Sequence, residues 1–185
     1  IRMRLVGSEM CIRDRYCPNG FQRIGLSATV GNPDETARWL SRDAIAIVGP
    51  SPRSTEVLVH RETPDPSDEA SSIIWSSSPH SVAAHRRLAN SLNEIYPALV
   101  FVNSRNAAES VSQRLRGINP DLKLGVHHGS LAAETRMKME ESLRSGGLHA
   151  IICTSSLELG IDIGSIKRVH QIQSPRAVDR LLQRM

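Results

Sequence analysis

Short apolar segments alternate with amphipathic ones along the second half of the chain. Residues 98–102 and 150–153 are continuous apolar runs, which are typical of strands buried on both faces of a parallel sheet. The predicted elements follow in the order helix 81–96, strand 98–102, helix 106–116, strand 122–126, helix 132–144, strand 150–153 and strand 166–172. This alternation predicts βαβ units, and therefore an α/β fold with a mostly parallel sheet.

A last helix is predicted at the end of the chain. Val178, Leu181, Leu182 and Met185 recur there at helical spacing. We expect the apolar face that they share to dock on the sheet.

The first 80 residues carry weaker patterns. Residues 1–16 resemble a translated sequencing-adapter scar and are expected to be non-native or disordered, with a frayed helix end as the alternative. Residues 17–49 predict strands at 22–26 and 44–48, with a helix from the cap at Asn32 to about Leu40.

A Gly-Pro-Ser-Pro cluster at residues 49–52 is the best domain boundary in the sequence. Residues 50–80 are expected to form a linker, an edge strand at 55–61 and a mobile loop at 62–78. The second domain is then expected to occupy residues 81–185.

Composition narrows the choice of partner and compartment. The formal net charge of +4 permits a polyanionic partner without requiring one, and an aromatic content of 3% leaves few side chains for base stacking. Cys11, Cys17 and Cys153 have neither zinc-ligand spacing nor even pairing, which favours a reduced, cytoplasmic setting. No apolar stretch approaches the roughly 20 residues of a membrane span, so we expect no membrane partner. We also expect a monomer.

Polar side chains follow the predicted strands, at the place where open α/β sheets bind their ligands. Asn103, Ser104 and Arg105 offer amide, hydroxyl and guanidinium donors for phosphate oxygens, although a simple helix cap explains the same three residues. A hydroxyl-rich turn follows the strand at 150–153 and consists of Thr154, Ser155 and Ser156.

Two adjacent histidines follow the strand at 122–126. A metal site is disfavoured there, because consecutive side chains of an extended segment point to opposite faces and no third ligand has a suitable spacing. Gly129 permits a close approach of the backbone to a ligand, and Ser130 can cap the next helix after His127 and His128.

Two more turns gain meaning only from their context. Gly160 lets the chain pass close to a ligand, and Asp162 can accept a hydrogen bond from a ribose hydroxyl, but a Gly-x-Asp pattern alone is weak. The segment Ser27-Ala28-Thr29 is, by itself, an ordinary hydroxyl turn.

Together these segments resemble the motifs of superfamily 2 helicases in their order, and they are most similar to the Lhr (large helicase-related) family. Ser27-Ala28-Thr29 resembles motif III, and Asn103-Ser104-Arg105 resembles motif IV. The segment His128-Gly129-Ser130 resembles a turn that meets the nucleic acid strand in helicase second domains. Residues 150–164 resemble motif V, and Gln183-Arg184 resembles the beginning of motif VI.

The resemblance implies a motor of two RecA-like domains, with ATP and Mg²⁺ between them and a strand of DNA or RNA running across both. It implies that residues 17–49 end the first domain, and that residues 81–185 form a second RecA-like sheet with helices on both faces. The resemblance implies that Ser27, Ala28 and Thr29 couple the nucleotide site to the nucleic acid track. Nucleic acid contacts fall to Asn103, Ser104, Arg105, His128, Gly129, Ser130, Thr154, Ser155 and Ser156. ATP binding or coupling falls to Gly160, Asp162, Gln183 and Arg184.

Several helicase motifs are missing from the 185 residues. The sequence has no Gly-x-x-x-x-Gly-Lys-Ser/Thr pattern and no Asp-Glu-x-His or Asp-Glu-Ala-Asp string, and motif VI stops before its arginines. We therefore expect an ATP-dependent helicase in the parent protein and no hydrolysis by this fragment alone. The alternative is a nucleotide- or partner-binding module without motor activity. A dehydrogenase is disfavoured, because no Gly-x-Gly-x-x-Gly follows a predicted strand.

Overall fold

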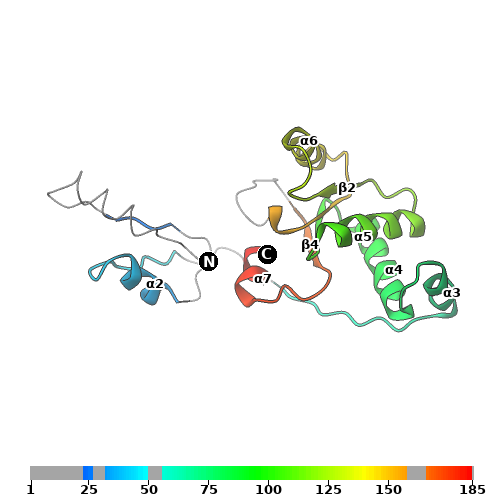
Figure 1. Cartoon of the computed structure of the whole chain (residues 1–185), viewed down its shortest axis with the longest axis horizontal. Coiled ribbons are helices and arrows are strands. Elements are labelled where there is room, and N and C mark those ends of the chain that lie inside the picture. Colours follow the sequence, from blue (N-terminus) through cyan, green and yellow to red (C-terminus); the bar gives the residue numbers. More distant parts are fainter. Residues whose placement is uncertain (1–22, 27–31, 50–55, 158–165, 185) are drawn as a thin grey trace. The chain divides into compact units, whose positions relative to one another are not determined.

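The computed structural model describes residues 23–26, 32–49, 56–157 and 166–184 (Figure 1). The chain divides into two compact units, Ile1–Pro52 and Arg53–Met185, and the division falls at the end of the Gly-Pro-Ser-Pro cluster. Within the described ranges, no helix has the length and the apolar character needed to cross a membrane.

The described part of the first unit contains helix α2 (Pro33–Leu40). The Asn32 side chain caps this helix by accepting a hydrogen bond from the Glu35 backbone N–H at 3.1 Å. The strands predicted at 22–26 and 44–48 are wrong within the described residues, because 23–26 and 44–48 form no strand. Ile45 and Ile47 are 86% and 94% exposed. Among the described residues, this apolar run therefore has no strand beside it that would bury its side chains.

The second unit is built on a parallel sheet whose described strands have the order β2-β3-β1-β4. The strands are β1 (Ala98–Phe101), β2 (Leu124–His127), β3 (Ala150–Cys153) and β4 (Arg168–Gln171). The central strands β1 and β3 are buried at every position, which explains their continuous apolar sequences. The predicted parallel α/β sheet is confirmed.

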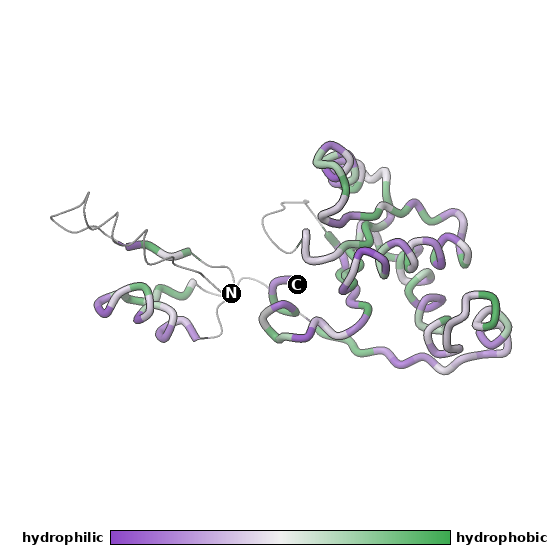
Figure 2. The backbone as a smooth tube through the Cα atoms, viewed as in Figure 1, coloured by the Kyte–Doolittle hydropathy of each residue, from purple (hydrophilic) through white to green (hydrophobic). Residues whose placement is uncertain are grey.

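Helices cover both faces of the sheet (Figure 1). On one face α4 (Pro79–Glu94) and α5 (Arg105–Ile118) enclose a core that contains Val100 and Ile152. On the other face α6 (Ala133–Arg144) places Leu143 in a second core. The hydropathy colouring in Figure 2 shows the alternation of hydrophobic and hydrophilic residues along these helices, as expected for elements with one buried face.

A glycine in β2 lets α6 pack closely on the sheet. A Cβ atom added to Gly125 would lie 3.0 Å from both Leu148 Cδ1 and Met139 Sδ, so a larger residue would force these side chains to move. Shortly after α6 ends, Gly146 adopts a φ of 78°, in the left-handed region that favours glycine.

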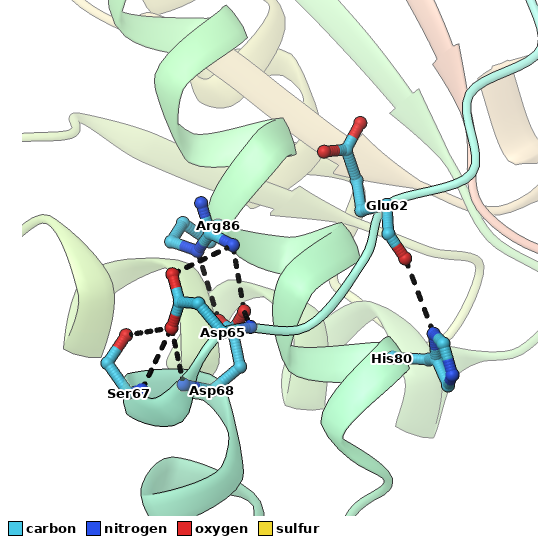
Figure 3. Close-up of polar contacts among 6 residues, drawn as sticks. All are labelled: Glu62, Asp65, Ser67, Asp68, His80 and Arg86. Atoms are coloured by element: carbon cyan, nitrogen blue, oxygen red, sulfur yellow. Dashed lines mark hydrogen bonds and ion pairs between the residues drawn. The ribbon is translucent and has the colours of Figure 1, made fainter.

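Residues 62–78 do not form the predicted mobile loop, because they contain helix α3 (Pro66–Ile74). Asp65 caps this helix, and the Asp68 carboxylate accepts the Asp65 backbone N–H in return, which completes a capping box. Arg86 of α4 then holds Asp68 through hydrogen bonds of 3.0 and 2.8 Å (Figure 3). The prediction failed because the Ser, Pro and Asp content indicated a loop, whereas here these residues form a helix cap and a first turn.

Helix α7 (Val178–Arg184) departs from its predicted packing. Val178 and Leu182 are 73% and 48% exposed and Leu181 is half-buried, so the described residues of the predicted apolar face are only partly buried. Met185 lies outside the described residues. The buried residue is Arg184, which is 6% exposed. Its guanidinium lies 4.8 Å from the centre of the Phe101 ring and donates to Gln171 Oε1, so a cation–π contact and a charge-assisted hydrogen bond help to hold α7 on the sheet.

The edge strand predicted at 55–61 is also wrong within the described residues. Residues 56–61 form no strand, and all six are exposed, so the apolar side chains that alternate along them are not buried.

In the edge strand β4, burial is the main cause that lowers the pKa of His170 to about 4, followed by the charges of Arg168 and His60. His170 is therefore neutral at pH 7.

Candidate nucleic-acid interface

The turns after β1, β2 and β3 lie at one edge of the sheet, because the strands are parallel and in register. Ser104 caps α5 through its hydroxyl oxygen. Arg105, the first residue of α5, reaches the turn after β2, where its Nη1 donates to Ser130 Oγ at 3.1 Å. Asn103 Nδ2 donates to the Ser174 carbonyl oxygen at 2.9 Å, which joins the turn after β1 to the one after β4.

The turns after β2 and β3 are tied together in the same way. The Thr154 backbone N–H donates to the His127 carbonyl oxygen at 3.2 Å. Ser156 Oγ lies 2.9 Å from His127 Nδ1, and the other ring nitrogen, Nε2, lies 2.9 Å from Glu140 Oε1 on α6. A buried imidazole therefore connects a helix on one face of the sheet to the hydroxyl-rich turn.

His127 and His128 point to opposite faces, as predicted for consecutive residues in an extended segment. Whereas His127 meets Glu140, the Nε2 atom of His128 lies 3.2 Å from Glu109 Oε1 on α5. In the part of the chain that the structure describes, no cluster of three or more His, Cys, Asp or Glu side chains could hold a metal ion. The two histidines are accounted for by separate carboxylates.

The exposed groups at this edge are mainly hydrogen-bond donors. Asn103, Ser104, Arg105, Ser130 and Ser155 are exposed, and they offer amide, guanidinium and hydroxyl groups that suit phosphate oxygens. We call the following nine residues the strand-end surface: Asn103, Ser104, Arg105, His128, Gly129, Ser130, Thr154, Ser155 and Ser156.

Backbone and charge on the strand-end surface are also compatible with a polyanion. A Cβ atom added to Gly129 would meet nothing within 4 Å, so the protein leaves space in front of this residue. Glu109 is an acidic neighbour, and its pairing with His128 limits the repulsion that it would exert on a phosphate.

Some predicted site residues are not brought to this surface. Arg184 packs against Phe101 and Gln171, and Gln183 lies beside it in α7. Five predicted residues lie outside the described residues, and their roles stay predictions: Ser27, Ala28, Thr29, Gly160 and Asp162.

Two polar residues of the site were not predicted from the sequence. Glu140 and Glu109 lie on helices, where acidic residues usually face solvent, and nothing in their spacing points to a histidine. The only signal was indirect, since adjacent histidines at the end of a buried strand need polar partners on both faces.

The fold and the strand-end turns define a class of protein, which sequence comparison identifies. The chain belongs to the family of the helicase conserved C-terminal domain, whose model matches residues 82–185. This family match agrees with the predicted RecA-like fold and favours the helicase over the isolated binding module.

Within superfamily 2, the chain is of the Lhr type. It is 33% identical over 207 residues to a Lhr helicase and probable uracil glycosylase from Mycolicibacterium smegmatis, which covers 93% of this chain and 13% of the relative. An ATP-dependent helicase Lhr-Core from Sulfolobus acidocaldarius is 33% identical over 176 residues, covering 90% of this chain and 19% of the relative. The solved structure of Mycobacterium smegmatis helicase Lhr bound to ssDNA and AMP-PNP superposes with a TM-score of 0.70 at 36% identity, covering 88% of this chain and 22% of that one. The chain thus spans less than a quarter of each of these three relatives.

Proposed function

We propose that the chain is part of an ATP-dependent helicase, and that its strand-end surface holds the backbone of a single nucleic acid strand. One observation carries the proposal: the Arg105–Ser130 hydrogen bond links the turns after β1 and β2, on either side of β3, and these turns present exposed donors along one edge of the sheet. The similarity to a helicase solved with ssDNA supports this assignment.

The contacts that this surface offers are directed at phosphate and not at bases. Hydroxyl, amide and guanidinium groups bind phosphate oxygens in any sequence, and aromatic side chains for base stacking are scarce in the chain, at 3%. We therefore expect binding that is independent of sequence, weak and sensitive to salt.

We further propose that the parent protein uses ATP with Mg²⁺, as the AMP-PNP in the related structure suggests. The phosphate-binding loop and the Mg²⁺ ligands would come from other parts of that protein, and Gly160, Asp162, Gln183 and Arg184 would contribute from this chain. On its own, the 185-residue chain should not hydrolyse ATP, and strand-stimulated phosphate release by the purified chain would contradict this. We also propose a cytoplasmic monomer, which sedimentation of the full-length protein would test.

The strand-binding proposal is tested with a fluorescently labelled oligodeoxynucleotide and the purified chain. Fluorescence anisotropy should show that Arg105→Ala weakens binding by about five- to tenfold and lowers the slope of log K against log[salt] by about 1. Lys123→Ala is the matched control, because it removes the same charge just before β2, at the opposite end of that strand from the strand-end turns. Equal losses for the two variants would mean that only net charge matters, and the surface would be wrongly placed.

Gly129→Ala gives a second, steric test of the same surface. The substitution should leave the melting temperature unchanged, because the added methyl group meets no protein atom within 4 Å. If a strand passes close to this backbone, the methyl group should nevertheless weaken binding. Unchanged binding would move the strand away from the turn after β2.

A further inference from the structure

The residues that precede the strands form a row at the other end of the sheet, opposite the strand-end surface. The Ala98 backbone N–H donates to the His149 carbonyl oxygen at 3.0 Å. The Lys167 backbone N–H donates to the Pro97 carbonyl oxygen, also at 3.0 Å. His149 Nδ1 accepts the Lys123 backbone N–H at 3.0 Å, which fixes the orientation of the imidazole ring. The beginnings of all four strands therefore lie side by side at this edge.

An exposed aromatic ring stands near the middle of this row. Tyr96 is 44% exposed, and its ring meets that of His149 edge to face, with the ring centres 4.6 Å apart. The Lys167 ammonium lies 6.0 Å from the centre of the Tyr96 ring, at the outer limit of a cation–π contact. The ring is therefore held by His149 and only loosely covered by a cation.

The two cations beside Tyr96 have no carboxylate partner in the described part of the chain. Lys167 and Arg168 are exposed, and neither forms an ion pair with a described residue. Arg168 instead donates to Ser91 Oγ at 3.1 Å, in the last turn of α4. Glu94 is an exposed acidic residue two positions before Tyr96, and the two cations outnumber it. This end of the sheet thus combines uncompensated positive charge with an aromatic ring.

We propose that an amino-end surface, formed by Tyr96, His149, Lys167 and Arg168, binds a second single strand of nucleic acid. A base stacks on Tyr96, and the two cations pair with phosphates. The exposed ring favours nucleic acid over an acidic protein segment, because carboxylates would pair with the cations and leave the ring unused. The Lys167 ammonium is placed loosely enough to leave the ring to a base and turn to a phosphate.

This second strand goes beyond the function proposed above, which concerns one strand at the other end of the sheet. The strands have four residues each, so about 13 Å of sheet separates the two surfaces. The two strands of an opened duplex would thereby be held apart by the sheet. The amino-end surface presents fewer donors than the strand-end surface, so we expect it to fill at higher strand concentrations.

The test uses the full 185-residue chain labelled with 3-fluorotyrosine, and an oligodeoxynucleotide as the ligand. The chain has two tyrosines, so the ¹⁹F NMR signal that is lost in Tyr96→Phe belongs to Tyr96. Adding the oligodeoxynucleotide should shift this signal in a saturable way. Arg105→Ala should leave this titration unchanged, because Arg105 follows β1 and Tyr96 precedes it.

Substitutions of two lysines separate a site from general attraction by charge. Lys167→Ala should weaken the binding measured at Tyr96 and lower the slope of log K against log[salt] by about 0.7, the contribution of one phosphate on a single strand. Lys123→Ala is the matched control, because it removes the same charge from the same end of the sheet, but β3 separates its strand from β1. Equal losses for the two variants would overturn the site.

Stacking on the ring is measured by fluorescence anisotropy in the Arg105→Ala chain, in which the strand-end surface is weakened. There, Tyr96→Leu should weaken binding at least about fivefold, whereas Tyr96→Phe keeps the ring and should stay within about twofold. Circular dichroism should show the same fold in both variants. Equal binding by the Leu and Phe variants would contradict stacking on Tyr96.

The remaining outcomes separate the two surfaces and the two kinds of partner. If the Tyr96 signal does not move at strand concentrations well above those that saturate the strand-end surface, the second surface alone is overturned. If the signal moves but Arg105→Ala leaves the anisotropy titration unchanged, the function proposed above fails and the second surface stands. An equal shift caused by poly-glutamate would overturn the assignment to nucleic acid, because an acidic protein segment would then suffice.

Discussion

A buried carboxylate, Asp68, ties α3 to α4 through Arg86, which also pairs with Asp65 at 3.2 Å. Asp68 is 1% exposed and accepts three hydrogen bonds, two from Arg86 and one from the Asp65 backbone N–H at 2.9 Å (Figure 3). The hydrogen bond from Arg86 is the main cause that lowers the pKa of Asp68. Replacing Asp68 by Ala removes every one of these contacts.

The expected cost follows from the geometry of the pair. Breaking a fully buried ion pair costs about 3–5 kcal/mol, but the Arg86 side chain is 36% exposed and keeps its ion pair with Asp65 at 3.2 Å, so water and Asp65 recover part of its hydrogen bonding. Hydrogen bonds to charged groups contribute about 1.5–3 kcal/mol and are not additive, and the lost half of the capping box adds about 1 kcal/mol. We therefore expect Asp68→Ala to destabilise the docked α3 by about 2–4 kcal/mol.

Because α3 packs mainly on α4, this loss should open α3 locally and leave the sheet folded. Hydrogen exchange measured by mass spectrometry should show residues 66–74 exchanging at least about 30-fold faster in Asp68→Ala, since 2 kcal/mol corresponds to that factor. Asp68→Asn, which keeps an acceptor for the Asp65 N–H, should lie between this variant and the wild type. Glu69→Ala is the control, because Glu69 is an exposed acid of the same helical turn.

Wild-type protection of α3 in Asp68→Ala would refute this reasoning. So would equal exchange in the Glu69→Ala control, because the effect would then come from any lost charge at the start of the helix. Uniformly faster exchange of the sheet would show that α3 is part of the cooperative core.

Three other predictions concern the second unit. The pKa of folded His170 is lowered to about 4, so the unfolded state binds more protons than the folded state between pH 6.5 and 4. The unfolding free energy should therefore fall by up to about 3 kcal/mol as the pH decreases through that window. In a series of urea denaturations at different pH values, His170→Phe should flatten this dependence. Arg184→Ala should cost about 1–3 kcal/mol by removing its buried contacts, whereas Arg180→Ala, which removes an exposed charge from the same helix, should leave the melting temperature within a degree or so. Gly125→Ala should destabilise the unit by about 1–3 kcal/mol through crowding of Leu148 and Met139, as thermal unfolding would reveal.

The elements of the second unit that are buried on one or both faces could be predicted from the sequence. Apolar runs and helical spacing located β1 to β4 and α4 to α6, with every bound within two residues of the prediction. The predictions failed where polar contacts decide the structure. Helix α3 is held by Asp68 and Arg86, which are 18 residues apart, and α7 buries Arg184 while Leu182 is 48% exposed. A pattern of apolar residues contains no information about such pairs.

The positions of the predicted site residues follow from the places where the strands end. The hydrogen bonds that connect these residues also involve side chains of the covering helices. Parallel strands bring the turns after β1 and β2 to one edge of the sheet, so locating the strands was enough to expect both turns there. The 3.1 Å contact between Arg105 and Ser130 also depends on the strand order, because β3 lies between β1 and β2. No comparable rule finds Glu140, because its contact with His127 depends on the rotation of α6 over the sheet. The close approach of that helix depends in turn on Gly125.

Two adjacent histidines at the end of β2 therefore give the strand-end surface different properties on its two sides. His128 lies 3.2 Å from Glu109, whose side chain is 61% exposed, so water competes for this contact and the contact contributes little. His127 lies 2.9 Å from Glu140, whose side chain is 22% exposed, so this contact is mostly shielded from water, and hydrogen bonds to charged groups are stronger in such surroundings. The contact of His127 with Glu140 consequently links α6 to Ser156 in the turn after β3, whereas the contact of His128 with Glu109 reaches a carboxylate that is open to water.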